Sequence, residues 1–318
     1  MKAKNILTAL FSTGCLLMSG ISMAASFPAK DMTIIVPKSP GGGTDITTRG
    51  LIEYAKHYTD KNIIAVNKPG AGGVTGMAQA AAARPDGYTM VMTTVELDIL
   101  PHLNRSPIDY KAFKFIVAPI SEPAGLIVPK DSPFNSVNDF VAYAKSHPGK
   151  LRVGNSGVGS IWHLASVAIK QNYGIDYIDV PYSGGSAPAV AALVGKHLDA
   201  ITVGPGNASS QIASGELKLL GIMSDKRSPL FPDVPTFKEL GHEFVVRAWA
   251  ALAVPSKVSE SRFKTLSGIF TKAVNDPGFV KFMNNQGIEV NKMTVKQVNQ
   301  MVREDNDYYK KLVKKIKL

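Results

Sequence analysis

The chain has 318 residues, of which 45% are hydrophobic and 19% charged, and its formal net charge is +11. This composition excludes a disordered chain and is typical of a folded protein with two domains of ordinary size. Basic residues are spread along the sequence without a stripe interleaved with aromatic residues, so we expect no nucleic-acid partner. They gather only at the C-terminal end, at Lys310, Lys311, Lys314, Lys315 and Lys317, where a solvated helix face is the simpler interpretation.

The first 25 residues differ from the rest of the chain. Lys2 and Lys4 precede a mostly apolar run over 6–18, and Ser22-Met23-Ala24 resembles a cleavage site. This pattern predicts a cleaved signal peptide over residues 1–25 and a periplasmic location. The alternative is an uncleaved anchor helix, for which the apolar run is short.

Cys15 is the only cysteine. Residues 12–15 faintly resemble a lipoprotein site, but the apolar run continues beyond Cys15, so lipidation ranks second to ordinary cleavage. After ordinary cleavage the mature chain has no thiol, which excludes disulfides and thiolate metal sites.

Short runs rich in β-branched residues then alternate with segments of helical spacing, as in the βαβ units of parallel sheets. The strands are expected at 32–37, 63–66, 88–94, 115–119, 125–128, 151–154, 177–180, 199–203, 218–223 and 246–254. The helices are expected at 46–58, 74–83, 161–173, 187–194, 259–274, 277–286 and 294–317. Capping pairs at Ser136/Asp139, Thr236/Glu239 and Thr294/Gln297 indicate helix starts.

Two glycine-rich turns follow the first two strands. They are residues 40–45 (PGGGTD) and 67–73 (NKPGAGG), and each precedes a helix. Such a turn exposes backbone N–H groups at the positive end of a helix, and glycines let the main chain approach a ligand closely. Two of them on neighbouring strands predict one anion-binding cradle.

The same unit occurs twice more in the second half, at residues 156–160 (SGVGS) and 181–186 (PYSGGS). A late strand at 246–254, followed by helices, returns the chain to the first sheet. The prediction is therefore an α/β protein with domain 1 formed by 26–122 plus 248–318 and domain 2 by 123–247. Two strands, near 120–126 and 243–252, would cross between the domains as a hinge, and all four turns would lie at strand carboxyl ends, where open α/β sheets bind ligands.

Nine motifs in register carry a resemblance to a known family. They are 34–37 with 40–45, 67–73, 85–89, 147–151, 156–160, 180–185, 227–229, 232–236, and Trp249 with Pro255. The mature chain resembles the substrate-binding proteins of tripartite tricarboxylate transporters, also called the Bug family of periplasmic receptors. The resemblance implies a two-domain periplasmic-binding-protein fold (Venus flytrap, type II-like) that closes on a small organic carboxylate. It also implies docking on integral-membrane permease subunits, and we expect a monomer.

The resemblance also implies a set of ligand-binding residues. In the first domain they are Gly42, Gly43, Thr44, Asp45, Gly70, Ala71 and Gly72. On the facing wall they are Ser156, Gly159, Ser160, His163, Tyr182, Gly184 and Gly185.

Three departures from the family pattern bear on the ligand. Many members carry an Asp or Asn just after the strand at 199–203, where this chain has Gly204-Pro205-Gly206. An amino-acid ligand would need a carboxylate there for its ammonium group, so the departure disfavours this class. Thr94 and Glu96 stand where relatives have small polar residues, so Glu96 would repel a second carboxylate or accept a hydroxyl. Arg247 would neutralise a distal carboxylate.

Other functions fit the sequence less well than a receptor. Gly70, Gly72 and Gly76 with Glu96 loosely match a dinucleotide fingerprint, but an exported protein meets no nicotinamide pool, so no cofactor is expected. The six histidines show no metal-ligand spacing on one helix. No catalytic residue is expected, although Ser160 and His163 leave an exported serine hydrolase as the runner-up. A pure interaction protein, with a sensor kinase or another membrane protein as its partner, is the third class.

Overall fold

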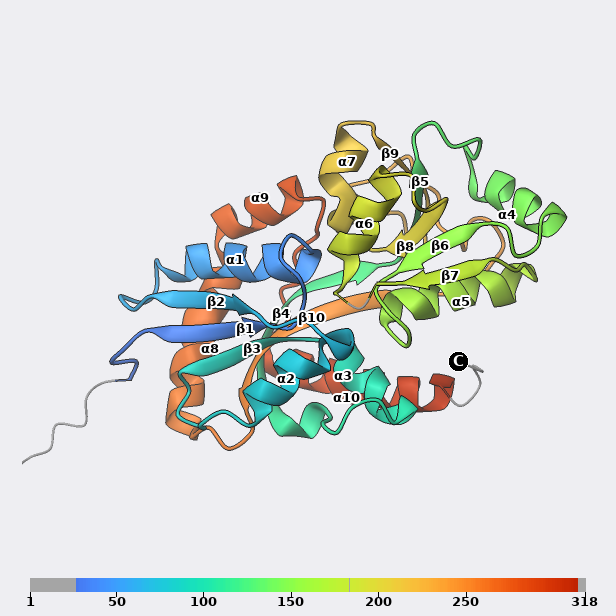
Figure 1. Cartoon of the computed structure of the whole chain (residues 1–318). Helices are drawn as coiled ribbons and strands as arrows, with labels where there is room; N and C mark the ends of the chain where they lie inside the picture. Colours follow the sequence, from blue (N-terminus) through green and yellow to red (C-terminus); the bar gives the residue numbers. More distant parts are fainter. Residues whose placement is uncertain (1–26, 183, 314–318) are drawn as a thin grey trace, which may run out of the picture.

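The computed structural model describes residues 27–182 and 184–313. The signal peptide, Cys15, and Lys314, Lys315 and Lys317 lie outside them. The described chain forms two lobes, each built on a five-stranded sheet (Figure 1). None of the described helices combines the length and the apolar character that a membrane-spanning segment needs.

Lobe 1 is built on the sheet with strand order β2-β1-β3-β10-β4. Its strands are β1 (Met32–Val36), β2 (Ile63–Asn67), β3 (Thr89–Thr94), β4 (Phe113–Pro123) and β10 (Arg247–Pro255). The first three pair in parallel, whereas β10 runs antiparallel between β3 and β4. The strand that comes last in the sequence is therefore an inner strand of the first sheet.

Helices cover both faces of this sheet. On one side α1 (Gly43–Ala55), α8 (Glu260–Asn275) and α9 (Pro277–Asn285) pack on one another. On the other side lie α2 (Val74–Ala81), α3 (Glu96–Ile99) and α10 (Val295–Val313) (Figure 1). The side of α1, α8 and α9 buries a continuous apolar cluster that includes Leu51, Phe270 and Phe279. Such packing on both faces explains why β1, β2 and β3 are mostly apolar.

Lobe 2 is built on the sheet with strand order β7-β6-β8-β5-β9. Its strands are β5 (Gly125–Pro129), β6 (Arg152–Asn155), β7 (Ile178–Pro181), β8 (Ala200–Val203) and β9 (Leu217–Ile222). Its helices are α4 (Val137–Ser146), α5 (Ile161–Tyr173), α6 (Ser186–Val194) and the short α7 (Ser209–Ala213). Helices α5 and α6 lie on opposite faces of the sheet (Figure 1).

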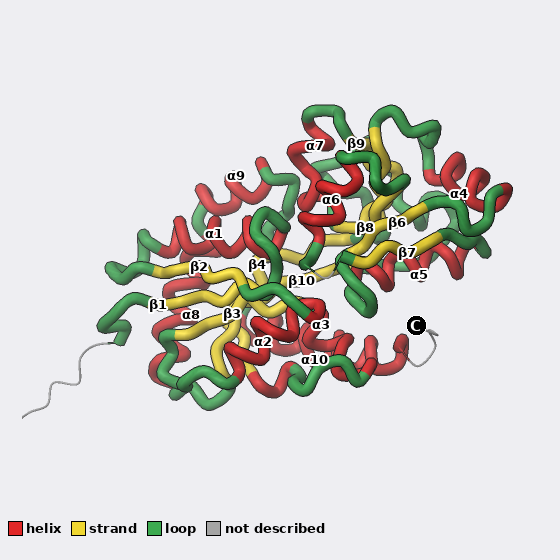
Figure 2. Tube along the Cα trace, in the orientation of Figure 1, coloured by secondary structure: helices red, strands yellow, loops and turns green. Residues whose placement is uncertain are grey.

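Two antiparallel strands join the lobes. Only Ala124 separates the end of β4 from the start of β5, and β10 returns alongside β4 with Trp249 opposite Ser121. Figure 2 shows this pair running from one sheet towards the other. The α/β two-lobe fold with two crossing strands is thus confirmed. The exact domain boundaries, 26–122 plus 248–318 and 123–247, stay a prediction.

The capping pairs behave in two ways. The Ser136 hydroxyl accepts a hydrogen bond from the Asp139 N–H at the start of α4, and Thr294 and Gln297 bond each other at the start of α10. Thr236 and Glu239 form the same reciprocal pair, but only a turn follows. A local capping box therefore does not by itself propagate a helix.

Candidate ligand-binding site

A small cavity lies between the lobes, where three helices begin. It is lined by the starts of α1 at Gly43 in lobe 1 and of α5 at Ile161 and α6 at Ser186 in lobe 2. Residues of the crossing strands β4 and β10 line it as well. Its volume is about 40 Å³, enough for a few water molecules. Each helix start has N–H groups without a partner in their own helix and carries about half a positive charge.

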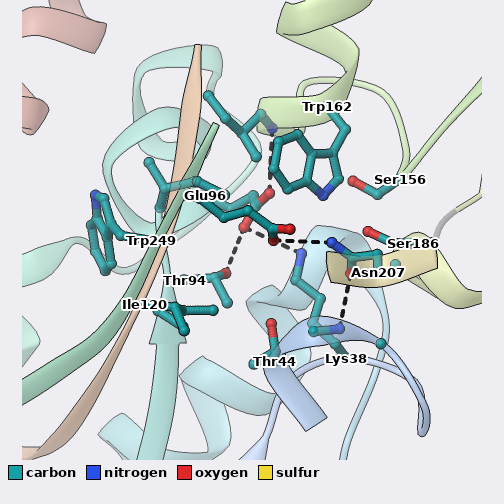
Figure 3. A pocket seen from close by; sticks show the side chains of 18 of the residues that line it. Lys38, Thr44, Thr94, Glu96, Ile120, Ser156, Trp162, Ser186, Asn207 and Trp249 are labelled. Carbon is teal, nitrogen blue, oxygen red and sulfur yellow. Dashed lines mark hydrogen bonds and ion pairs between the residues drawn. The ribbon is translucent and has the colours of Figure 1, made fainter. Parts of the chain in front are cut away.

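A buried ion pair lies in this cavity. The Lys38 ammonium is 3.2 Å from Glu96 Oε2, and these side chains are only 11% and 3% exposed (Figure 3). Glu96 also accepts hydrogen bonds from the Thr94 hydroxyl at 2.5 Å and from the Ile161 N–H of lobe 2 at 3.3 Å. Burial raises the pKa of Glu96, but Lys38 and Thr94 outweigh burial and leave that pKa below its usual value. Glu96 is therefore an ionised carboxylate.

Asn207 connects lobe 1, lobe 2 and the hinge. Its Oδ1 accepts a hydrogen bond from the Gly43 N–H at 2.9 Å, and its Nδ2 donates to Glu122 Oε2 at 3.2 Å (Figure 3). Asn207 itself lies just after β8, in the 3-10 turn Pro205–Ala208. The amide oxygen of Asn207 thus occupies the N-terminus of α1.

Glu122 lies at the end of β4 and is buried. Its Oε1 accepts a hydrogen bond from the Gly206 N–H at 2.5 Å. The Glu122 carboxyl also fills the space beside Gly204, where an added Cβ would be 2.1 Å from the Glu122 Cδ. Burial raises the pKa of Glu122 to about 7, although the hydrogen bonds from Gly206 and Asn207 oppose the rise.

This raised pKa makes ligand-free stability depend on pH. Between about pH 4.5 and 7 the folded state binds the Glu122 proton more tightly than the unfolded state, so stability decreases as the pH rises through this window. The expected contribution is up to about 3 kcal/mol. We expect the fall in the free energy of unfolding from pH 5 to pH 7.5 to be smaller in Glu122→Gln than in the wild type, measured by urea titration. An equal fall in both proteins would contradict the assignment.

The first glycine turn borders the cavity, and Asp45 supports it from behind. Gly42, Gly43 and Thr44 line the space. Among the described residues, the Thr44 N–H has no acceptor. Asp45 is buried outside the lining and accepts hydrogen bonds from the Gly41 N–H, Arg49 and Asn67. Burial raises the pKa of Asp45, but these bonds outweigh it and lower that pKa. Asp45 therefore fixes the turn and, through Asn67, the strand beside it.

The second glycine turn does not line the cavity. Gly70, Ala71 and Gly72 all have positive φ, and Gly70 directly precedes the short 3-10 turn Ala71–Gly73, which leads into α2. The Gly72 carbonyl accepts a hydrogen bond from Lys38 Nζ at 2.9 Å. The turn thus holds the ammonium group that pairs with Glu96, instead of presenting N–H groups to the cavity.

The residues proposed for the runner-up hydrolase do not form a nucleophile–base pair. The Ser160 hydroxyl accepts a hydrogen bond from the His163 backbone N–H as the cap of α5 and also from the Ser156 hydroxyl. The ring Nδ1 of His163 accepts from the Gly159 N–H at 3.1 Å. Burial lowers the pKa of His163. The imidazole is consequently neutral and is oriented towards the backbone of its own turn.

The other candidate residues are distributed around the cavity. Ser156 and Gly185 line it, whereas Gly184 contributes a carbonyl that accepts from the Ser39 N–H across the lobes. Tyr182 is half-buried outside the lining. Gly159 packs against Leu100 and Leu103. Arg247 is exposed, and its guanidinium is 3.9 Å from Asp305, so it does not face the cavity.

Several lining residues were not singled out from the sequence as ligand-binding. They are Lys38, Ser39, Ile120, Glu122, Ser186 and Asn207. Trp162 and Trp249 also border the space. Figure 3 shows the Trp162 ring beside Ser156 and the Trp249 ring on the far side of the hinge strands, where its indole donates to Asp305. One signal was available for Asn207, which directly follows the Gly204-Pro205-Gly206 departure.

Comparison with known proteins identifies the family. Residues 48–318 match the family described as the tripartite tricarboxylate transporter family receptor, TctC. The chain belongs to this family. The resemblance inferred from the sequence motifs is therefore confirmed.

Individual relatives agree with this membership. The TctC-family chain is 31% identical, over 317 residues, to a UPF0065 protein from the gbd 5′ region of Cupriavidus necator, covering 99% of this chain and 96% of that protein. It superposes on the periplasmic binding protein BugD with a TM-score of 0.86 at 29% identity, covering 91% of this chain and 98% of BugD. For MatC from Rhodopseudomonas palustris with bound malate, the TM-score is 0.83 at 26% identity, covering 90% and 100%. BugD is a periplasmic binding protein and MatC holds malate, and this chain is a periplasmic solute-binding protein of the TctC receptor family, not an enzyme.

Proposed function

We propose that this TctC-family protein captures a small organic carboxylate between its lobes and delivers it to the membrane subunits of a tripartite tricarboxylate-type transporter. One observation carries the proposal, namely the convergence of the α1, α5 and α6 N-termini on a single cavity. Helix N-termini favour anions because their N–H groups and dipoles point at the ligand. The malate bound to the relative MatC agrees with a carboxylate ligand.

The carboxylate is expected to bind at the start of α1. There it would accept hydrogen bonds from the N–H groups of Gly43 and Thr44, and the Asn207 amide oxygen would leave Gly43. Charge-assisted hydrogen bonds of this kind contribute about 1.5–3 kcal/mol each. A micromolar dissociation constant, which corresponds to about 8 kcal/mol, is reasonable for such a pre-organised site.

Binding requires the lobes to move apart. The cavity of about 40 Å³ is far smaller than the roughly 300–1,000 Å³ of typical small-molecule sites. The lobes meet through hydrogen bonds from Gly43 to Asn207, from Ile161 to Glu96 and from Ser39 to Gly184. We infer that these contacts open about β4 and β10, and that the lobes close again over the ligand.

Ligand titration tests the proposal. We expect at least one acid in a panel of mono-, di- and tricarboxylates to raise the melting temperature and to bind with a micromolar dissociation constant in calorimetry. The matched control is the primary amide of the same acid, which keeps the shape but lacks the charge and should not bind. If no acid stabilises the protein, or if acid and amide bind equally, the carboxylate assignment is wrong.

The proposal also includes a periplasmic location and docking on membrane subunits. The predicted signal peptide over 1–25 would bring the receptor to the periplasm as a monomer. The closed form would then dock on the integral-membrane permease subunits. Uptake of the identified acid by cells should be lost when the receptor gene is deleted and restored by the wild type. Unchanged uptake would contradict the delivery role.

A further inference from the structure

The proposed function leaves the class of carboxylate open, and the charges in the cavity narrow it. Two glutamates and one lysine line the space. Lys38 is already paired with Glu96 at 3.2 Å, so Glu122 contributes one uncompensated carboxyl group. Among the described residues, no lysine or arginine nitrogen lies within 4.0 Å of Glu122. A di- or tricarboxylate would therefore bring further negative charge towards a buried acid.

The second cavity that Glu122 borders supplies no net positive charge. A second cavity of about 510 Å³ lies on the other side of the hinge and shares Glu122 with the first. Its other charged residues are two acids and two bases, namely Asp225, Lys226, Arg227 and Glu289. The group that compensates Glu122 is therefore expected to come from the ligand side.

The hydrogen bonds of the Asn207 side chain indicate which acceptor and donor groups a ligand must offer at this site. It presents an acceptor to the Gly43 N–H at 2.9 Å and a donor to Glu122 at 3.2 Å. If the amide were flipped, its oxygen would face the Glu122 carboxyl and its NH₂ group would face the Gly43 N–H. The surrounding groups therefore determine which end of the Asn207 amide is oxygen. Acceptor and donor are separated by a single carbon atom. A ligand that displaces Asn207 must offer an anionic acceptor and a nearby donor in the same order.

We propose that the ligand is a zwitterionic amino acid whose carboxylate binds at the α1 N-terminus and whose ammonium group binds Glu122. The proposal rests on the proposed function, since it deepens the same site. In an α-amino acid two carbon atoms separate a carboxylate oxygen from the ammonium nitrogen, which is one atom more than the spacing that the Asn207 amide bridges. The ammonium supplies the cation that Glu122 lacks, and a buried carboxylate gains most from a directly bonded cation. An amino-acid ligand needs a carboxylate for its ammonium group, which the family pattern places just after β8. In this chain Glu122 of the crossing strand β4 would supply it.

Matched ligands test the assignment on the wild-type protein. The standard L-amino acids are titrated in calorimetry alongside succinate, L-malate and citrate. L-Aspartate and L-malate differ only by ammonium and hydroxyl, and the same comparison uses the 2-hydroxy counterpart of whichever amino acid binds. We expect an amino acid to bind at least about 30-fold more tightly than its hydroxy counterpart, and its N-acetyl derivative not to bind, because both changes remove the cation that pairs with Glu122.

A variant then assigns the effect to Glu122. Glu122→Gln should weaken amino-acid binding roughly 30-fold or more and leave binding of the hydroxy counterpart unchanged or tighter. Glu289→Gln is the matched control, because Glu289 is exposed in the second cavity. Melting temperature and circular dichroism verify folding, and the N-acetyl comparison needs no variant. Binding of di- or tricarboxylates but of no amino acid would overturn this inference and leave the proposed function intact. Binding of neither class would overturn both.

Discussion

Replacing Gly43 by valine is expected to abolish ligand binding while leaving the fold intact. A Cβ at Gly43 would already lie 3.1 Å from Asn207 Oδ1, so the valine methyl groups would fill the start of α1 and obstruct its N–H groups. Overpacking of about 1–3 kcal/mol together with one lost charge-assisted hydrogen bond predicts a loss of at least about 100-fold in affinity. Calorimetry with the ligand found for the wild type measures this loss of affinity.

The matched control is Gly268→Val. Gly268 is an exposed residue of α8, and an added Cβ there meets no atom within 4 Å. Both variants should melt within a few degrees of the wild type, but only Gly43→Val should lose ligand-induced stabilisation. Full affinity in Gly43→Val would remove the α1 N-terminus from the site.

Replacing Lys38 by methionine is expected to destabilise the protein even without ligand. Glu96 would remain buried without its cation, and loss of one partner of a buried pair costs about 3–5 kcal/mol. We expect about 3 kcal/mol, because opening of the lobes gives water access to Glu96. Urea titration at pH 7.5 measures the loss.

The pH dependence of the free energy of unfolding distinguishes loss of the Lys38–Glu96 ion pair from loss of packing. In the wild type the pKa of Glu96 is below its usual value, so the stability that the pair provides is present above about pH 4.5 and decreases in acid. Without Lys38, burial dominates and raises that pKa, so stability is lost as the pH rises instead. The difference between the two proteins should therefore shrink from pH 7.5 to pH 5. The exposed pair of Lys56 and Glu53 provides the control, because Lys56→Met should cost less than about 1 kcal/mol at either pH.

The sequence predicted the fold well because the fold depends on local patterns. Apolar β-branched runs bounded by glycine turns coincide with the strands of both sheets. The late strand at 246–254 is β10 of the first sheet. Helices α3 and α7, which are only 4 and 5 residues long, were missed because such short segments carry no clear period.

The sequence predicted the site less well than the fold, because the site depends on the direction of side chains and on how the lobes meet. The two glycine turns of lobe 1 look alike in sequence, yet only the first lines the cavity, while the second holds Lys38. Glu122 reaches the cavity because it shares a strand face with Ile120, two residues before it. That face is oriented by the pairing of β4 with β10, which no local motif encodes.

The position of Glu122 on a crossing strand has a consequence for how ligand preference can change. A residue that both recognises the solute and belongs to the joint between the lobes links selectivity to the ease of bending. A substitution at position 122 should therefore alter the balance of open and shut molecules together with the choice of solute. Engineering a new preference in this receptor would require the flexing segment to be redesigned with the binding surface.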